Sequence, residues 1–114
     1  MKTVQENVNR DTLDSLRIIR RKLYSIPEVE LSGMSLEDQS EYGSSLHQTG
    51  LAILKLEAAK LKGVNDDFKK QELKLKSAAF KLEADIGNLL DAVKVIRVIG
   101  EGLKLITNIV NLLA

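Results

Sequence analysis

The sequence contains no cysteine and no tryptophan, and it has a single proline, Pro27. Without cysteine the chain has no disulfide and no thiolate for catalysis or metal binding, although this absence does not fix the cellular compartment. Only two tyrosines and two phenylalanines are present. So few prolines and aromatic residues favour an all-helical chain over a sheet protein.

Long hydrophobic runs are also missing. No stretch of about 18 uncharged apolar residues occurs, so we expect no transmembrane helix. The first ten residues are polar and have no apolar core behind them, so we expect no signal peptide. These absences predict a cytoplasmic protein, with secretion that needs no signal peptide as the alternative.

Neither sign of charge dominates. The formal net charge is +1, which gives no electrostatic case for nucleic acid or an anionic membrane as the main target. Four cations, Arg17, Arg20, Arg21 and Lys22, make one side of the first expected helix basic. They could contact phosphates, or they could be solvated cations near a helix C-terminus, where the macrodipole favours them. No stacking aromatic residues accompany them, so we favour the solvated face and expect no nucleic-acid partner.

Start and stop signals divide the 114 residues, a length typical of one domain, into helices. Asp11 is a plausible N-cap for the first helix, and Pro27 disfavours helical backbone at the residue before it. Ser35, with Asp38 at the third helical position, resembles a capping box for the second helix. The expected helices span residues 11–25, 36–62, 66–99 and 103–113.

Two connections are predicted between these helices. In residues 27–34 we expect Val29, Leu31 and Met34 to tuck under the bundle as the chain turns. Gly63 is a natural C′ residue for the second helix, and Asn65 or Asp66 can cap the third at once. This short turn predicts that the second and third helices are antiparallel neighbours.

An unbroken apolar seam runs through the third expected helix and beyond it. Its members are spaced alternately by four and three residues: Leu75, Ala79, Leu82, Ile86, Leu89, Val93, Ile96, Gly100 and Leu103. This spacing predicts a long helix packed lengthwise against another helix. Gly100 and Gly102 fall within one turn and permit a kink or a stop there.

The second helix offers a matching stripe at Leu54, Ala58 and Leu61, with Ile53 beside it. Its first half is weaker, because it contains several poor helix formers. The predicted fold is therefore all-α. It is an antiparallel hairpin of two long helices, with an N-terminal helix packed on it and a short apolar C-terminal helix, giving a bundle of three or four helices.

The sequence shows no catalytic constellation. His47 is the only histidine, and no cysteine or second histidine could complete a common type of metal site. The glycines at 100 and 102 do not follow a strand, so they do not form a phosphate loop. We therefore expect no enzyme activity, no catalytic residue, no metal and no cofactor.

The apolar arc widens after Val93, and the second helix is too short to cover it. An uncovered face of this kind marks an interface. The predicted function is protein assembly, as a homo-oligomer or a hetero-complex, through the C-terminal apolar helix. The predicted interface residues are Val93, Ile96, Ile99, Leu103, Ile106, Val110 and Leu113.

Two alternatives accompany this prediction. A second interface candidate is the small-residue face at Gly43, Leu46 and Gly50, where another helix could approach closely. A different function is membrane association, in which the amphipathic C-terminal helix lies in a bilayer interface or contributes to an oligomeric pore. Lys94, Arg97 and Lys104 on its polar face favour this alternative. Against it, Asp91 and Glu101 share that face, and no tryptophan anchors the helix.

Overall fold

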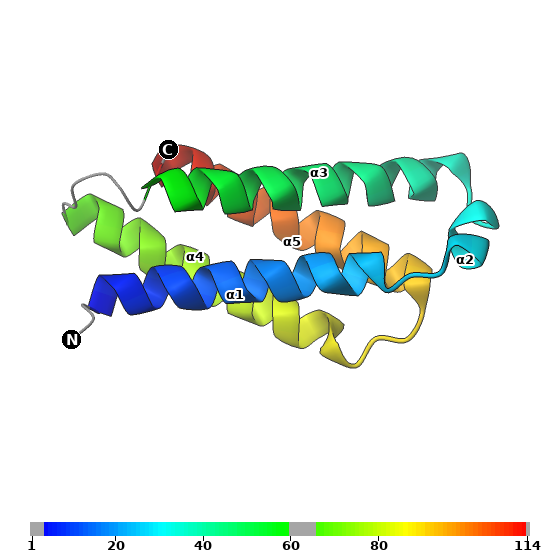
Figure 1. Ribbon diagram of the computed structural model, residues 1–114, viewed down its shortest axis with the longest axis horizontal. Helices are drawn as coiled ribbons and strands as arrows, with labels where there is room; N and C mark the ends of the chain where they lie inside the picture. The colour runs from blue at the N-terminus through cyan, green and yellow to red at the C-terminus, as the bar shows by residue number, and fades with distance from the viewer. Residues whose placement is uncertain (1–3, 60–65, 114) are drawn as a thin grey trace.

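The protein is a bundle of long helices in a computed structural model that describes residues 4–59 and 66–113. The elements are α1 (Val4–Tyr24), α2 (Glu28–Ser32), α3 (Leu36–Ala59), α4 (Asp66–Gly87) and α5 (Ala92–Leu113). No strand occurs in these ranges, so the all-α class is confirmed for them. The bundle measures 47 × 23 × 17 Å. In Figure 1, α1 and α4 run in one direction, and α3 and α5 run in the other.

The four long helices occupy the corners of the bundle. α5 packs against α3 and α4, and α1 packs against the same two helices. Within residues 4–59 and 66–113, α3 and α4 make no extensive contact, so they lie on opposite corners. The prediction that these two helices pack on each other as a hairpin was therefore wrong. The seam of α4 is filled by α5 and α1 instead.

Local capping chemistry gave several helix boundaries correctly. α1 ends at Tyr24, three residues before Pro27, and α3 begins at Leu36 as predicted. The hydroxyl of Ser35 accepts a hydrogen bond from the backbone N–H of Asp38, at 3.1 Å. α4 begins at Asp66, also as predicted. The expected C′ position of Gly63 and the cap at Asn65 lie outside the described residues.

The beginning of the chain differs from the expectation. α1 extends over Val4–Tyr24, so Asp11 lies inside a helix and is not an N-cap. The connection after α1 contains a short helix, α2, that begins directly after Pro27. Leu31 and Met34 pack against the core as expected, but Val29 is 78% exposed. Helical geometry explains this difference, because Val29 and Leu31 are two residues apart in α2 and therefore point about 200° apart around the helix.

The largest correction concerns the third expected helix, because residues 66–99 are not one helix. α4 ends at Gly87, and a new helix, α5, begins at Ala92 and runs back along the bundle. Asp91 caps α5, since its Oδ1 accepts the backbone N–H of Lys94 at 3.0 Å. The four-three spacing continued across the turn because both helices point their apolar faces at one core.

Gly100 and Gly102 lie within α5 and do not break it. They are positions of close approach. A Cβ added at Gly102 would lie 2.6 Å from Cδ1 of Leu82, so this glycine lets α4 approach α5 closely. A Cβ added at Gly100 would overlap the carboxylate of Glu41 on α3. The two glycines therefore serve the packing of α5 against its two neighbours.

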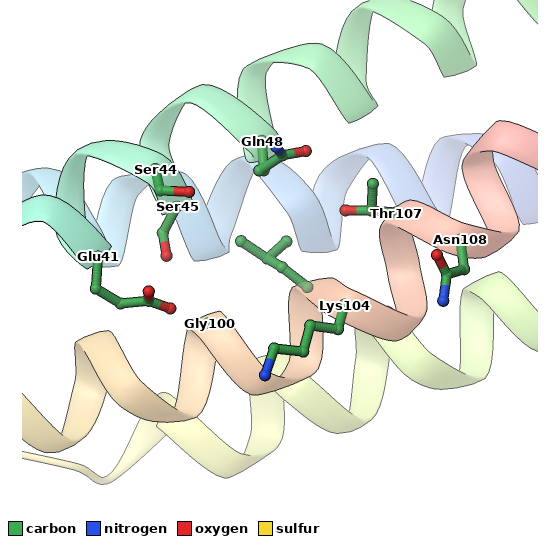
Figure 2. A pocket seen from close by; sticks show the side chains of 9 residues that line it. Glu41, Ser44, Ser45, Gln48, Gly100, Lys104, Thr107 and Asn108 are labelled. Carbon is green, nitrogen blue, oxygen red and sulfur yellow. The ribbon is translucent and has the colours of Figure 1, made fainter.

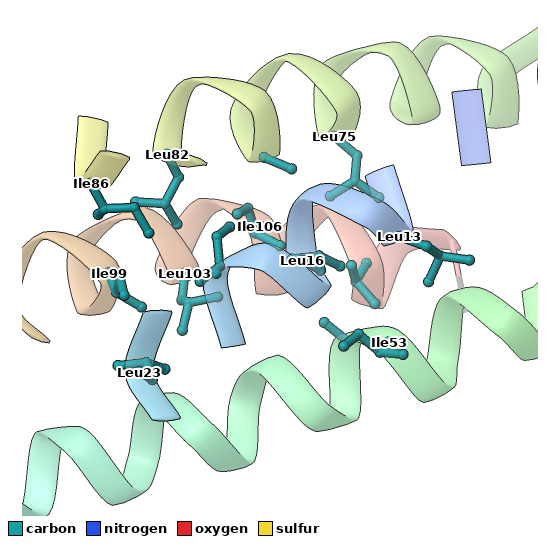
Figure 3. Close-up of a cluster of buried hydrophobic side chains, with 14 of the residues drawn as sticks. Leu13, Leu16, Leu23, Ile53, Leu75, Leu82, Ile86, Ile99, Leu103 and Ile106 are labelled. Atoms are coloured by element: carbon teal, nitrogen blue, oxygen red, sulfur yellow. The ribbon is translucent and has the colours of Figure 1, made fainter. Parts of the chain in front are cut away.

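The hydrophobic core lies between the four long helices (Figure 3). Each fully buried leucine or isoleucine stabilises the fold by about 1.5–3 kcal/mol. Those with at most 1% exposure come from α1, α4 and α5: Leu13, Leu16, Ile19, Leu23, Leu75, Ile86, Ile96, Ile99 and Ile106.

α3 turns a different face to the core from the one predicted. Leu54 is 64% exposed and Ala58 is exposed, whereas Ala52, Ile53 and Leu56 are buried. Upstream, the buried face consists of small polar residues, Ser45 and Thr49. The Thr49 hydroxyl donates to the backbone oxygen of Ser45 at 2.7 Å, which satisfies it without a partner on another helix. The predicted stripe at Leu54 and Ala58 therefore faces outward, and Leu61 lies outside the described residues.

Alanine should change the free energy of unfolding differently at the two glycines of close approach, Gly100 and Gly102. Gly102→Ala should lower the free energy of unfolding, because overpacking against buried Leu82 costs about 1–3 kcal/mol. This outweighs the gain of about 1 kcal/mol in helix propensity. Gly100→Ala should be neutral or stabilising, because the Glu41 side chain can swing away.

Gly43→Ala is the control, since nothing lies within 4 Å of a Cβ added there. It should stabilise the protein by up to about 1 kcal/mol. Urea unfolding followed by circular dichroism measures all three variants. A Gly102→Ala variant as stable as Gly43→Ala would show that α4 and α5 do not approach closely at this point.

Candidate functional site

The structure places most of the predicted interface inside the protein's own core. Five of the seven residues are at most 3% exposed: Ile96, Ile99, Leu103, Ile106 and Val110. They fill the space between α5 and its neighbours, so they cannot form an exposed docking surface, and the prediction of their role is corrected. Val93 is half-buried, and the side chain of Leu113 lies outside the described residues.

The second predicted interface remains a surface of the molecule. Gly43 is exposed, Gly50 is half-buried, and nothing lies within 4 Å of a Cβ added at either glycine. No helix of the described chain approaches this face. Leu46 is partly buried against the core, so its side chain is less open to a partner than the two glycines are. Whether another molecule uses the small-residue face stays a prediction.

A groove of about 440 Å³ lies between α4 and α5. Four small or apolar residues form most of its apolar lining: Ala78, Leu82, Val98 and Gly102. Leu105 also lines the groove and is 56% exposed. Gly102 carries no side chain, so α4 and α5 approach each other closely where Leu82 meets Gly102.

Three apolar residues of α5 continue this groove along the helix. Val98, Leu105 and Leu112 are spaced by seven residues, which keeps them on one side of a helix, about 10 Å apart. Leu105 and Leu112 are 56% and 71% exposed, and Val98 is half-buried. We call these three residues the α5 strip. They were missing from the predicted site, although their seven-residue spacing was visible in the sequence.

Charged residues form the rim of the α4/α5 groove. Two belong to each helix: Lys81 and Asp85 to α4, and Arg97 and Glu101 to α5. Arg97 also pairs with Asp38 of α3, with Nε and Oδ1 3.5 Å apart. Glu101 pairs with Lys104 at 3.2 Å. The Arg97 and Glu101 side chains are nevertheless 68% and 77% exposed, so both remain accessible to a partner.

A second groove, of about 480 Å³, separates α3 from α5 and has polar walls. In Figure 2, Ser44 and Gln48 of α3 lie across from Thr107 and Asn108 of α5, while Glu41 reaches toward Gly100. The groove exists because α3 carries short side chains here. Beyond it, Lys55 closes the gap by donating to Oδ1 of Asn111 at 2.8 Å. Its walls offer hydrogen-bonding groups together with the apolar side chain of Leu103.

A third, smaller groove of about 190 Å³ lies at the end of the bundle that carries α2, between Pro27 and Leu90. Leu90, in the turn between α4 and α5, is 96% exposed. Near this end, partial burial raises the pKa of the Tyr42 phenol, and the neighbouring Tyr24 phenol raises it further.

Chemistry-bearing groups do not converge in any of these grooves. Within the part of the chain that the structure describes, no group of three or more histidine, cysteine or acidic residues is arranged to hold a metal ion. His47 is exposed and lies outside the linings of the three grooves described above. Among the described helices, none is both long and apolar enough to cross a membrane.

The chain matches no known family model, and no curated protein or solved structure shows significant similarity to it. The function is therefore inferred from the geometry of these surfaces.

Substitution by aspartate should have very different effects on stability at two adjacent residues of α5, Leu105 and Ile106. Ile106→Asp places a carboxylate in the core at a position with 0% exposure, and it should cost several kcal/mol and unfold the protein. Leu105→Asp, on the exposed strip, should change the free energy of unfolding by no more than about 0.5 kcal/mol. Thermal and urea unfolding measure both variants. A folded, stable Ile106→Asp protein would contradict the placement of that side chain in the core.

Proposed function

We propose that this protein is a non-enzymatic helical interaction module that binds a protein partner through the α5 strip and the α4/α5 groove. The observation that carries the proposal is the exposure of Leu105 and Leu112. Both lie on a helix whose remaining apolar side already packs in the core. Exposed apolar residues beside a groove with charged residues on its rim are typical of protein interaction sites.

The exposed leucines make little contribution to the fold, and this supports a role outside it. The core of α5 is complete without them, because five neighbouring apolar residues are at most 3% exposed. A leucine that is 71% exposed, as Leu112 is, keeps most of its apolar surface in water. Burial against a partner would recover about 25 cal/mol for each Å² removed from water.

A protein partner fits this surface better than the other ligand classes. The net charge of +1 gives no strong field for the phosphates of nucleic acid. Insertion of α5 into a bilayer would have to draw its main apolar face out of the bundle core, where it is already buried. A helix or loop of a partner protein could bind to the α5 strip and the α4/α5 groove without any change in the bundle. The polar groups of the partner would then contact the charged rim.

Site-specific photo-crosslinking in the cells that make the protein tests this proposal. A crosslinking amino acid at position 105 or 112 should give discrete protein adducts. The control is position 73, because Leu73 is 57% exposed on α4 but does not line the groove. Equal labelling at 105, 112 and 73, or no adduct at 105 and 112, would contradict the proposed function.

A further inference from the structure

The occupant of the α4/α5 groove follows from the order of charges on its rim. α4 and α5 run antiparallel, and Leu82 lies against Gly102, which fixes their register. With a rise of about 1.5 Å per residue, Lys81 lies within about 3 Å of the level of Glu101. Asp85 lies equally close to the level of Arg97. Each helix thus presents one cation and one anion, in opposite order across the groove.

Because the order of charges is opposite on the two helices, the rim of one copy can pair opposite charges with the rim of a second copy. If a second copy is rotated by 180° about an axis parallel to the helices, its α5 faces α4 of the first copy at the same level. Lys81 then faces Glu101 of the second copy, and Asp85 faces Arg97 of the second copy. Because the symmetry repeats both contacts, the dimer gains four contacts between opposite charges.

The apolar groups of the groove fit the same rotation. Leu105 lies within about 1.5 Å of the level of Ala78, by the register given above. In the rotated pair, the exposed Leu105 of each copy therefore faces the small Ala78 of the other. The large side chain of Leu105 and the small side chain of Ala78 both line the groove, so one surface offers a projecting apolar group and a small apolar residue opposite it.

We propose that the α4/α5 groove is the interface of a symmetric homodimer, in which α4 of each copy lies against α5 of the other. This proposal rests on the proposed function and names a second copy of the chain as the partner. The groove is small, so we expect a weak dimer that populates at high micromolar concentration. Since rim charges are exposed, association should weaken as the ionic strength rises.

Sedimentation of the 114-residue chain and two charge variants tests the arrangement. At high micromolar concentration the wild-type chain should sediment as a dimer. Lys81→Glu creates two contacts between like charges by symmetry and should weaken dimerisation at least tenfold. The double variant Lys81→Glu with Glu101→Lys restores opposite charges at both contacts and should recover the dimer. Circular dichroism should be unchanged, because both side chains lie on the exposed rim.

A matched pair of apolar variants tests the centre of the interface. Leu105→Glu should abolish the dimer, whereas Leu73→Glu, at nearly equal exposure on α4 outside the groove, should not. A monomeric wild-type chain, or a dimer that is unaffected by Lys81→Glu and Leu105→Glu, would overturn the homodimer. Failure of the double charge variant to recover the dimer would overturn the pairing of α4 with α5.

These outcomes are separate from failure of the proposed function. A monomeric chain whose position 105 crosslinks to a protein of different mass would remove the homodimer and leave the interaction module standing. A chain that neither dimerises nor crosslinks at 105 and 112 would remove both.

Discussion

The apolar face of α5 must be buried against α3 and α4 at the same time, and the remaining structure depends on that requirement. α5 reaches this position only because the chain reverses between Gly87 and Ala92, where Asp91 caps the new helix. Its two glycines then let Leu82 approach from one side and Glu41 from the other. Because α5 occupies the space between α3 and α4, those two helices are held apart at opposite corners.

Local signals predicted much of the secondary structure, whereas the pairing of helices could not be read from spacing. Pro27, Ser35 and Asp66 marked boundaries because caps and stops act over a few residues. The seam from Leu75 to Leu103 has the same four-three spacing whether it lies on one helix or on two that share a core. For α3, the small polar residues Ser45 and Thr49 are buried, and their helix propensities could not predict this.

None of the residues predicted for the interface belongs to the α5 strip. The width of the apolar arc indicated more apolar residues on the C-terminal helix than one packed side needs, and Leu105 and Leu112 are exposed there. The sequence could not say which part of the arc the core would use, since that depends on the directions from which α3 and α4 approach. Once those directions are known, Ile106 belongs to the core and its neighbour Leu105 to the surface. The sequence likewise could not show that Lys81 and Glu101 lie on one groove, because only the fold brings these two charged residues together on its rim.

The return of α5 along α4 is the central claim, and electron-spin distance measurement tests it most directly. Spin labels at Lys74 and Asn108 occupy exposed positions on the two helices. In the bundle these positions lie near the same level of neighbouring helices, whose axes are about 8–10 Å apart, so the labels should give a short distance of roughly 10–20 Å. A sample diluted with unlabelled protein isolates the distance within one chain. A distance near 50 Å, as about 1.5 Å per residue along one continuous helix would give, would contradict the fold and the groove built on it.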